Sequence, residues 1–151
     1  MKRNFLLSGM ILLAIALTGC DGKSTSDSDT TYDWGITMTA ENVTPSGVDV
    51  RIEQSGGAVT GELQTGTYYI IEQQENGEWT EVPKLLPEDE VAWLSVAMML
   101  QQDYHQTFPT DWGWLYGELP AGDYRIGKWI TDFRDTGDYD DCMYYAEFTI
   151  K

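Results

Sequence analysis

Residues 119–131 read LPAGDYRIGKWIT, and the alternation in their second half is typical of a β-strand that covers a core. In an extended chain Tyr124 and Ile126 lie on one face, while Arg125 and Trp129 lie on the other. At the start of the strand, the Tyr124 ring can fill the end of the core while its hydroxyl group satisfies a loop group that water does not reach. The stretch therefore predicts a strand whose first aromatic residue holds the corner before it.

The same alternation of apolar and polar residues recurs along the chain from Trp34 to Lys151. It predicts strands at residues 36–40, 48–52, 68–73, 79–82, 107–112, 123–131 and 143–150. The dipeptide Asn76-Gly77 predicts a two-residue hairpin turn, because both residues tolerate a positive φ. Strands at short intervals, without the spacing of strand-helix-strand units, indicate an all-β fold in which two antiparallel sheets form a sandwich.

Residues 92–100 are apolar enough to suit either a helix or a buried strand. The preceding residues 87–90 read PEDE, which is compatible with the start of a helix. We predict a strand here because the rest of the domain has the pattern of β-structure. A helix in this segment would weaken the prediction of a simple sandwich.

Of the 151 residues, 25 are Asp or Glu and nine are Lys or Arg, which gives a formal net charge of -16. This charge argues against binding to nucleic acid and against docking on anionic lipid through a basic patch, since both need cationic side chains. The chain also contains six Trp, nine Tyr and four Phe residues. Disordered acidic chains lack this much apolar material, so we expect one compact folded domain.

The first twenty residues have the pattern of a targeting segment. Lys2 and Arg3 precede an apolar stretch at residues 5–17, which is short against the roughly 20 residues that span a bilayer. Residues 17–20 read LTGC, which resembles the lipobox of bacterial lipoproteins. The resemblance implies cleavage before Cys20, acylation of its sulfur with fatty acids such as palmitate, and anchoring at the extracytoplasmic side of the cell membrane.

Several other motifs resemble those of bacterial immunoglobulin-like domains in surface lipoproteins. They are the corner at residues 119–124, the hairpin at 76–79, the string at 114–119 and the segment at 145–148. The resemblance implies an antiparallel immunoglobulin-like β-sandwich of about seven to eight strands, in which the Tyr124 hydroxyl group bonds to upstream backbone. It also places the chain among relatives without the intersheet disulfide of antibody domains, because Cys142 is the one remaining thiol once Cys20 carries lipid.

The expected organisation has three parts. Residues 1–19 are the lipoprotein signal peptide, residues 20–33 hold the lipidated cysteine and a flexible tether rich in Ser, Thr and Asp, and residues 34–151 form the immunoglobulin-like domain. In this topology the chain enters at the end that carries the connection between the last two strands. We therefore expect the acidic residues 132–141 to lie near the tether.

No arrangement of catalytic side chains stands out in the sequence. His105 is the only histidine, and no G-x-S-x-G sequence marks a nucleophile for it. Cys142 follows three aspartates within residues 138–141, and such neighbours suppress the thiolate form that acts as a nucleophile. We therefore expect a protein without enzyme activity, as the resemblance also implies.

Four aromatic residues form a candidate ligand-binding site: Trp112, Trp114, Tyr116 and Trp129. Together with Trp93 they are too many to point inward from one small sandwich, and Trp129 shares its strand face with Arg125. Exposed aromatic clusters mark interaction sites, so these residues are candidates for a platform that binds a sugar ring or a protein. The alternative is ordinary packing over the core.

Asp135, Asp138, Asp140 and Asp141 form a candidate calcium site before the last strand. Calcium takes about six to eight oxygen ligands, which Asp-rich loops supply. The spacing matches no EF-hand, and the alternative is a solvated acidic loop. We expect no other cofactor.

These observations predict a non-enzymatic binding or adhesion module at the bacterial cell envelope. Its expected partners are the membrane, through lipidated Cys20, and an unidentified protein or glycan, but no nucleic acid. Two alternatives stay open, namely a structural spacer or accessory subunit of an envelope complex and a sandwich-type inhibitor of a secreted enzyme. A contiguous exposed aromatic patch favours the binding module over the spacer.

Replacing Cys20 with Ala tests the lipobox. We expect an unprocessed or mislocalised precursor, because stable anchoring requires the acyl chains that Cys20 carries. Labelling with a fatty acid and membrane fractionation measure this outcome. A Cys20→Ala protein that is still cleaved and still carries lipid would contradict the prediction.

Overall fold

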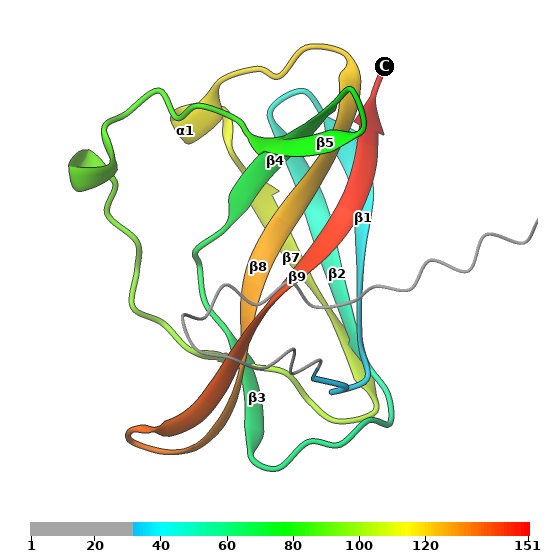
Figure 1. Ribbon diagram of the computed structural model, residues 1–151, viewed down its shortest axis with the longest axis vertical. Helices are drawn as coiled ribbons and strands as arrows, with labels where there is room; N and C mark the ends of the chain where they lie inside the picture. Colours follow the sequence, from blue (N-terminus) through cyan, green and yellow to red (C-terminus); the bar gives the residue numbers. More distant parts are fainter. Residues whose placement is uncertain (1–31) are drawn as a thin grey trace, which may run out of the picture.

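The computed structural model describes residues 32–151, which form two antiparallel β-sheets packed face to face (Figure 1). One sheet has the order β1-β2-β7, with β1 at Ile36–Thr44, β2 at Gly47–Gln54 and β7 at Tyr104–Asp111. The other has the order β5-β4-β8-β3-β6, and β9 also pairs with β8. Its strands are β3 (Glu62–Thr65), β4 (Ile70–Glu75), β5 (Glu78–Glu81), β6 (Met98–Met99), β8 (Gly122–Asp135) and β9 (Asp138–Ile150).

The structure confirms the predicted all-β, antiparallel sandwich. Two short helical turns, η1 (Glu88–Glu90) and α1 (Gly113–Tyr116), interrupt the connections. Cys142 is the only cysteine within residues 32–151, so no disulfide joins the two sheets in this part of the chain. The predicted signal peptide, the lipidated Cys20 and nearly all of the predicted tether lie outside the described residues.

Strand β8 is the centre of the second sheet. It pairs with β9 along nearly its whole length on one edge. On the other edge it pairs first with β4, where Ile71 faces Ile126, and then with β3, where Leu63 faces Asp132. β3 and β4 are therefore two parts of one strand that is interrupted at residues 66–69.

The core lies between the sheets and follows the predicted alternation. Alternate residues of β2 and β8 are buried, among them Val48, Val50, Ile52, Tyr124, Ile126 and Ile130. Trp112 and Leu115, at the end of β7 and in α1, are fully buried and close one end of the core. The apolar residues that alternate in the sequence thus lie on the inward faces of the strands.

The corner before β8 has the predicted geometry. The Tyr124 hydroxyl group donates a hydrogen bond to the Pro120 carbonyl oxygen at 3.0 Å, and the ring is 1% exposed. The ring stacks on Phe148 of β9, with 5.8 Å between the ring centroids, and Phe148 in turn stacks on Trp112. Tyr124 therefore joins the corner to the aromatic end of the core.

The Asn76-Gly77 hairpin is also confirmed. Both residues have positive φ, 54° for Asn76 and 85° for Gly77, and Glu75 of β4 pairs with Glu78 of β5. Positive φ at both central positions gives the turn the twist that matches the flanking strands. As a result Trp79 faces Gln74 across the hairpin.

The predicted strand over residues 92–100 is wrong except at Met98 and Met99. These two residues pair with Thr65 and Gln64 of β3, whereas residues 91–97 have no regular structure. The physical reason is the interruption after Thr65, because β3 offers no further backbone with which residues 91–97 can pair. A preceding helix does not form either, since η1 covers only Glu88–Glu90.

A buried lysine accounts for the interruption. Lys128 points into the sandwich from β8, is 3% exposed, and donates hydrogen bonds to the carbonyl oxygens of Gly66 at 2.9 Å and Tyr68 at 3.3 Å. A buried ammonium group needs such acceptors because losing its water is costly. Burial lowers the pKa of Lys128 from its ordinary 10.5 to about 8.

Removing one hydroxyl group tests the corner. We expect Tyr124→Phe to lower the free energy of unfolding by about 1 to 2 kcal/mol, because the Pro120 carbonyl loses its donor. The matched control is Tyr139→Phe, since Tyr139 is 52% exposed and its hydroxyl group bonds to no described residue. Chemical denaturation measures both variants, and equal midpoints for the two would contradict the role of Tyr124.

Lys128 makes the stability depend on pH. Between about 8 and 10.5 the unfolded chain holds the proton that the folded protein has released, so stability should rise as pH increases through this window. Relative to Lys128→Met, the wild-type free energy of unfolding should gain about 2 kcal/mol from about pH 7 to about pH 9.5. Denaturation curves recorded at each pH measure the difference, and a constant difference would show that the ammonium group is not buried.

Candidate binding surface

Exposed apolar side chains occur along the connection between β5 and β7 and on α1. Leu85 is 64% exposed, Leu94 71%, Val96 50% and Trp114 48%. Figure 1 shows the first part of this connection, residues 82–97, looping out beside β4 and β3, with α1 near its upper part. We call Leu85, Trp93, Leu94, Val96 and Trp114 the apolar surface.

Aromatic contacts attach this surface to the sandwich. The Trp93 ring meets the rings of Tyr68, Tyr69 and Trp114 edge-on, with centroids 5.1, 5.2 and 5.8 Å away. Burial raises the pKa of the Tyr69 hydroxyl group, which stays protonated and donates to the Asp111 carbonyl oxygen at 3.1 Å. The half-buried Trp93 therefore holds its exposed neighbours in place.

Hydrogen bonds fix the backbone on both sides of Trp93. The Thr67 hydroxyl group donates to the Leu94 carbonyl oxygen at 2.9 Å, which ties residues 91–97 to the interruption between β3 and β4. The Leu85 amide donates to the Leu115 carbonyl oxygen at 2.8 Å, which ties the start of the connection to α1. The apolar surface is thus attached at two separate points.

The short helix α1 sets the direction of Trp114. The chain leaves β7 at Asp111, whose carboxylate accepts a hydrogen bond from the Gly113 amide at 2.8 Å and starts the turn. The Trp114 indole N–H donates to the Asp111 carbonyl oxygen at 3.1 Å, and Gly117 ends the helix with a φ of 74°. The indole donor is used within the protein, so Trp114 presents its ring to solvent.

The four aromatic residues predicted to bind a ligand do not form one site. Trp112 is fully buried and Tyr116 is 5% exposed, so both belong to the core. Trp129 is half-buried on β8, on the strand face opposite the core residues, and only Trp114 reaches the apolar surface. The reason is the helical turn at α1, which directs neighbouring aromatic residues to different sides instead of lining them up.

Leu85, Trp93, Leu94 and Val96 were not among the predicted binding residues. For Trp93, Leu94 and Val96 the signal is the apolar segment that follows the acidic residues 88–90, whereas Leu85 precedes it. The sequence pattern predicts a buried strand for this segment, because periodicity alone does not distinguish buried apolar residues from exposed ones.

Carboxylates lie close to the apolar surface in the sequence. The η1 residues Glu88, Asp89 and Glu90 are all exposed, and Val91 and Ala92 separate them from Trp93. Lys84 forms ion pairs with Glu81 at 3.2 Å and with Glu88 at 2.8 Å. Asp89 and Glu90 form no ion pair with any residue from 32 to 151.

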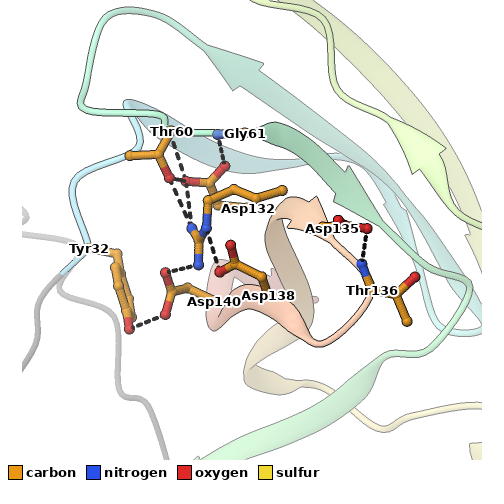
Figure 2. Close-up of polar contacts among 9 residues, drawn as sticks. Tyr32, Thr60, Gly61, Asp132, Asp135, Thr136, Asp138 and Asp140 are labelled. Carbon is orange, nitrogen blue, oxygen red and sulfur yellow. Dashed lines mark hydrogen bonds and ion pairs between the residues drawn. The ribbon is translucent and has the colours of Figure 1, made fainter.

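A second polar cluster surrounds Arg134 at the turn between β8 and β9 (Figure 2). The Arg134 guanidinium group donates to Asp138 at 2.8 Å, to Asp140 at 2.9 Å and to the Thr60 hydroxyl group at 2.9 Å. A shift in register between Phe133 and Asp135 places Arg134 at a bulge in the ribbon. Arg134 therefore offsets part of the negative charge of the carboxylates around it.

Asp132 lies buried beneath Arg134. Its carboxylate accepts hydrogen bonds from the Thr60 amide and hydroxyl groups at 2.9 and 2.8 Å, and from the Gly61 amide at 2.7 Å. Burial by itself raises the pKa of Asp132, but these hydrogen bonds and the Arg134 charge outweigh it and lower the pKa. Asp132 thereby joins the chain before β3 to β8.

The predicted calcium ligands do not converge. Asp138 and Asp140 both bind Arg134, whereas Asp135 accepts a hydrogen bond from the Thr136 amide and Asp141 one from the Thr131 hydroxyl group. Within residues 32–151 no group of three or more acidic, His or Cys side chains is arranged to hold a metal ion. The acidic residues lie on paired strands and not in a loop, which separates them onto two faces.

The described chain begins beside this cluster, as predicted. The Tyr32 hydroxyl group donates to Asp140 at 2.9 Å, and the Tyr144 hydroxyl group donates to the Tyr32 carbonyl oxygen at 3.3 Å. Figure 1 shows the β8–β9 turn at the opposite end of the sandwich from α1. The described chain therefore begins at one end of the sandwich, and α1 with Trp114 lies at the other.

Comparison with known proteins identifies the family of the domain. The family described as bacterial Ig-like domain matches residues 32–149, which is most of the chain. No curated protein and no solved structure matches it. No helix within residues 32–151 is long and apolar enough to cross a membrane. The match, the two antiparallel sheets and the tyrosine corner agree, and the chain belongs to the family of bacterial Ig-like domains.

Proposed function

We propose that this protein is a lipid-anchored, extracytoplasmic binding module that holds a protein partner on the apolar surface. The observation that carries the proposal is the exposure of Leu85, Leu94, Val96 and Trp114 on one connection and the adjoining turn α1, because large apolar side chains left in water mark interaction sites. Membership of the bacterial Ig-like domain family agrees with a binding or adhesion module. Attachment to the membrane would be through Cys20.

The shape of the surface favours a protein over a glycan. A sugar ring stacks on a flat exposed aromatic face, but the Trp93 and Trp114 rings are inclined at 67° to each other and form no common plane. The most exposed members of the surface are aliphatic, with Leu94 at 71%. Aliphatic side chains gain most from contact with the apolar groups of a protein.

The position of the surface agrees with anchoring through the N-terminal segment. The chain enters next to Arg134 and Asp140, whereas Trp114 lies near the other end of the sandwich (Figure 1). In a protein anchored at Cys20, the entry end would face the membrane. The apolar surface would then be directed away from it and be accessible to a partner.

The described residues favour binding over catalysis. His105, the only histidine, is exposed on β7 and stacks on Tyr104 with 5.3 Å between the ring centroids, and its imidazole group makes no hydrogen bond with any residue from 32 to 151. General acid–base chemistry needs a base within hydrogen-bond reach of its proton donor. We therefore propose a role without enzyme activity.

Site-specific photo-crosslinking in intact cells tests the proposal. A photoreactive residue at Leu94 should give a discrete adduct, because this side chain would be covered by the partner. The matched control position is Tyr104, which is 54% exposed and lies outside the apolar surface. Trp114→Ser should abolish the Leu94 adduct and, since the ring is about half exposed, should lower stability by only about 1 kcal/mol.

No adduct at Leu94, or adducts of equal yield at Leu94 and Tyr104, would contradict the binding function. An adduct at Leu94 that persists in Trp114→Ser would show that the partner does not use the apolar surface as a unit. Denaturation of Trp114→Ser checks that the domain remains folded.

A further inference from the structure

We infer that the partner of the apolar surface presents a basic segment, in which Lys or Arg side chains flank apolar ones. This inference rests on the proposed function and adds the chemistry of the partner to it. It is carried by the unpaired carboxylates of Asp89 and Glu90, which are close in sequence to Trp93 and Leu94, by the exposed part of the Trp114 ring and by the net charge of the chain.

The carboxylates of Asp89 and Glu90 lack cations of their own. Within the connection from β5 to β7, Lys84 is the only Lys or Arg, and its ammonium group is already shared between Glu81 and Glu88. Asp89 and Glu90 form no ion pair with any described residue and lie three to five residues from Trp93 and Leu94. Their charges are therefore available to cations of a partner that covers the apolar side chains.

The acidic cluster at the β8–β9 turn shows the contrast. There Arg134 binds Asp138 and Asp140 and lies 3.7 Å from Asp132, so three carboxylates have a cation within the protein. Beside the apolar surface no described residue plays this part for Asp89 and Glu90. Charge complementarity across an interface speeds association and selects the partner. The unpaired carboxylates of Asp89 and Glu90 would have this role toward a basic partner.

Trp114 provides a second contact for a cation. Its indole N–H is bonded to the Asp111 carbonyl oxygen, so the part of the side chain that reaches solvent is the ring. Lys and Arg groups are attracted to the face of a Trp ring. The same contact occurs elsewhere in this domain, where the Arg125 guanidinium carbon lies 4.7 Å from the centroid of the Trp79 ring.

The net charge argues against a second copy of this chain as the occupant. Each copy has a formal net charge of -16, and the η1 carboxylates of the two copies would come closer together if two apolar surfaces met. Like charges placed together oppose association, whereas a basic segment is attracted over a distance set by the ionic strength. A basic partner protein is therefore favoured over self-association.

The test uses the full-length lipidated protein, solubilised in detergent, on three kinds of short immobilised peptide. The first contains only Leu and Lys, the second replaces Lys with Glu, and the third replaces Leu with Ser. We expect the Leu-Lys peptide to bind at least about tenfold more tightly than either of the others, because it supplies both apolar contact and cations. Raising the ionic strength should weaken this binding.

Two double variants separate local charge from overall charge. Asp89→Asn with Glu90→Gln should weaken binding to the Leu-Lys peptide about fivefold to tenfold. Glu41→Gln with Glu147→Gln removes the same charge from exposed positions on β1 and β9 and should leave binding within about twofold. Glu90→Lys should reduce the preference for Lys over Glu peptides further. Equal losses in the two double variants would overturn the inference, because the attraction would then be non-specific.

Leu94→Ser, with Tyr104→Ser as its control, distinguishes failure of the inference from failure of the proposed function. Loss of binding in Leu94→Ser alone, together with equal affinity for the Leu-Lys and Leu-Glu peptides, overturns the basic partner and keeps the apolar surface. Unchanged binding in Leu94→Ser overturns the proposed function itself. Binding of the wild-type protein to immobilised glycans that is lost in Trp114→Ser would replace the protein partner by a glycan.

Discussion

The ammonium group of Lys128 lies inside the sandwich, and the form of the second sheet follows from its need for acceptors. The carbonyl groups of Gly66 and Tyr68 turn toward it, which splits the partner of β8 into β3 and β4. Because β3 ends at Thr65, β6 pairs over only two residues. The chain before β6 has no strand to join, and its apolar side chains stay at the surface. One buried charge thus connects the core to the surface that we propose for binding.

Features that depend on local chemistry could be predicted from the sequence. The period of two located most strands, Asn76-Gly77 located the hairpin, and Tyr124 identified the corner. The apolar surface could not be predicted in the same way, because it depends on the absence of a partner strand beside residues 91–97. Residues 91–97 could form a strand only beside a partner strand, and the interruption of that partner lies at the acceptors of Lys128, which is distant in sequence. Burial of Trp112 likewise depends on a turn of helix that has no strong sequence signal.

For the acidic residues too, composition could be read from the sequence but spatial arrangement could not. Counting carboxylates indicated calcium, but the count does not reveal that Arg134 lies among them at a bulge. A guanidinium group fixed by three partners occupies the place where a metal ion would be expected. Beside the apolar surface the single lysine is already paired with two glutamates, and nearby carboxylates stay unpaired. Similar local compositions therefore produce one cluster in which each of three carboxylates lies beside a cation and one region in which Asp89 and Glu90 have none.

The hydrogen bonds of Tyr32 have a mechanical consequence. They join the start of the described chain to Asp140 and Tyr144, which both belong to β9, and β9 pairs with β8 over nearly its whole length. Tension applied from the N-terminal side would first load these bonds and then pass into the longest ribbon of the molecule. The carbonyl groups of Trp34 and Gly35 accept hydrogen bonds from Gln54 and Ser55 at the end of β2, so the three-stranded sheet would share the load. Under a pull from a surface attachment, both sheets would therefore resist before β1 itself is loaded.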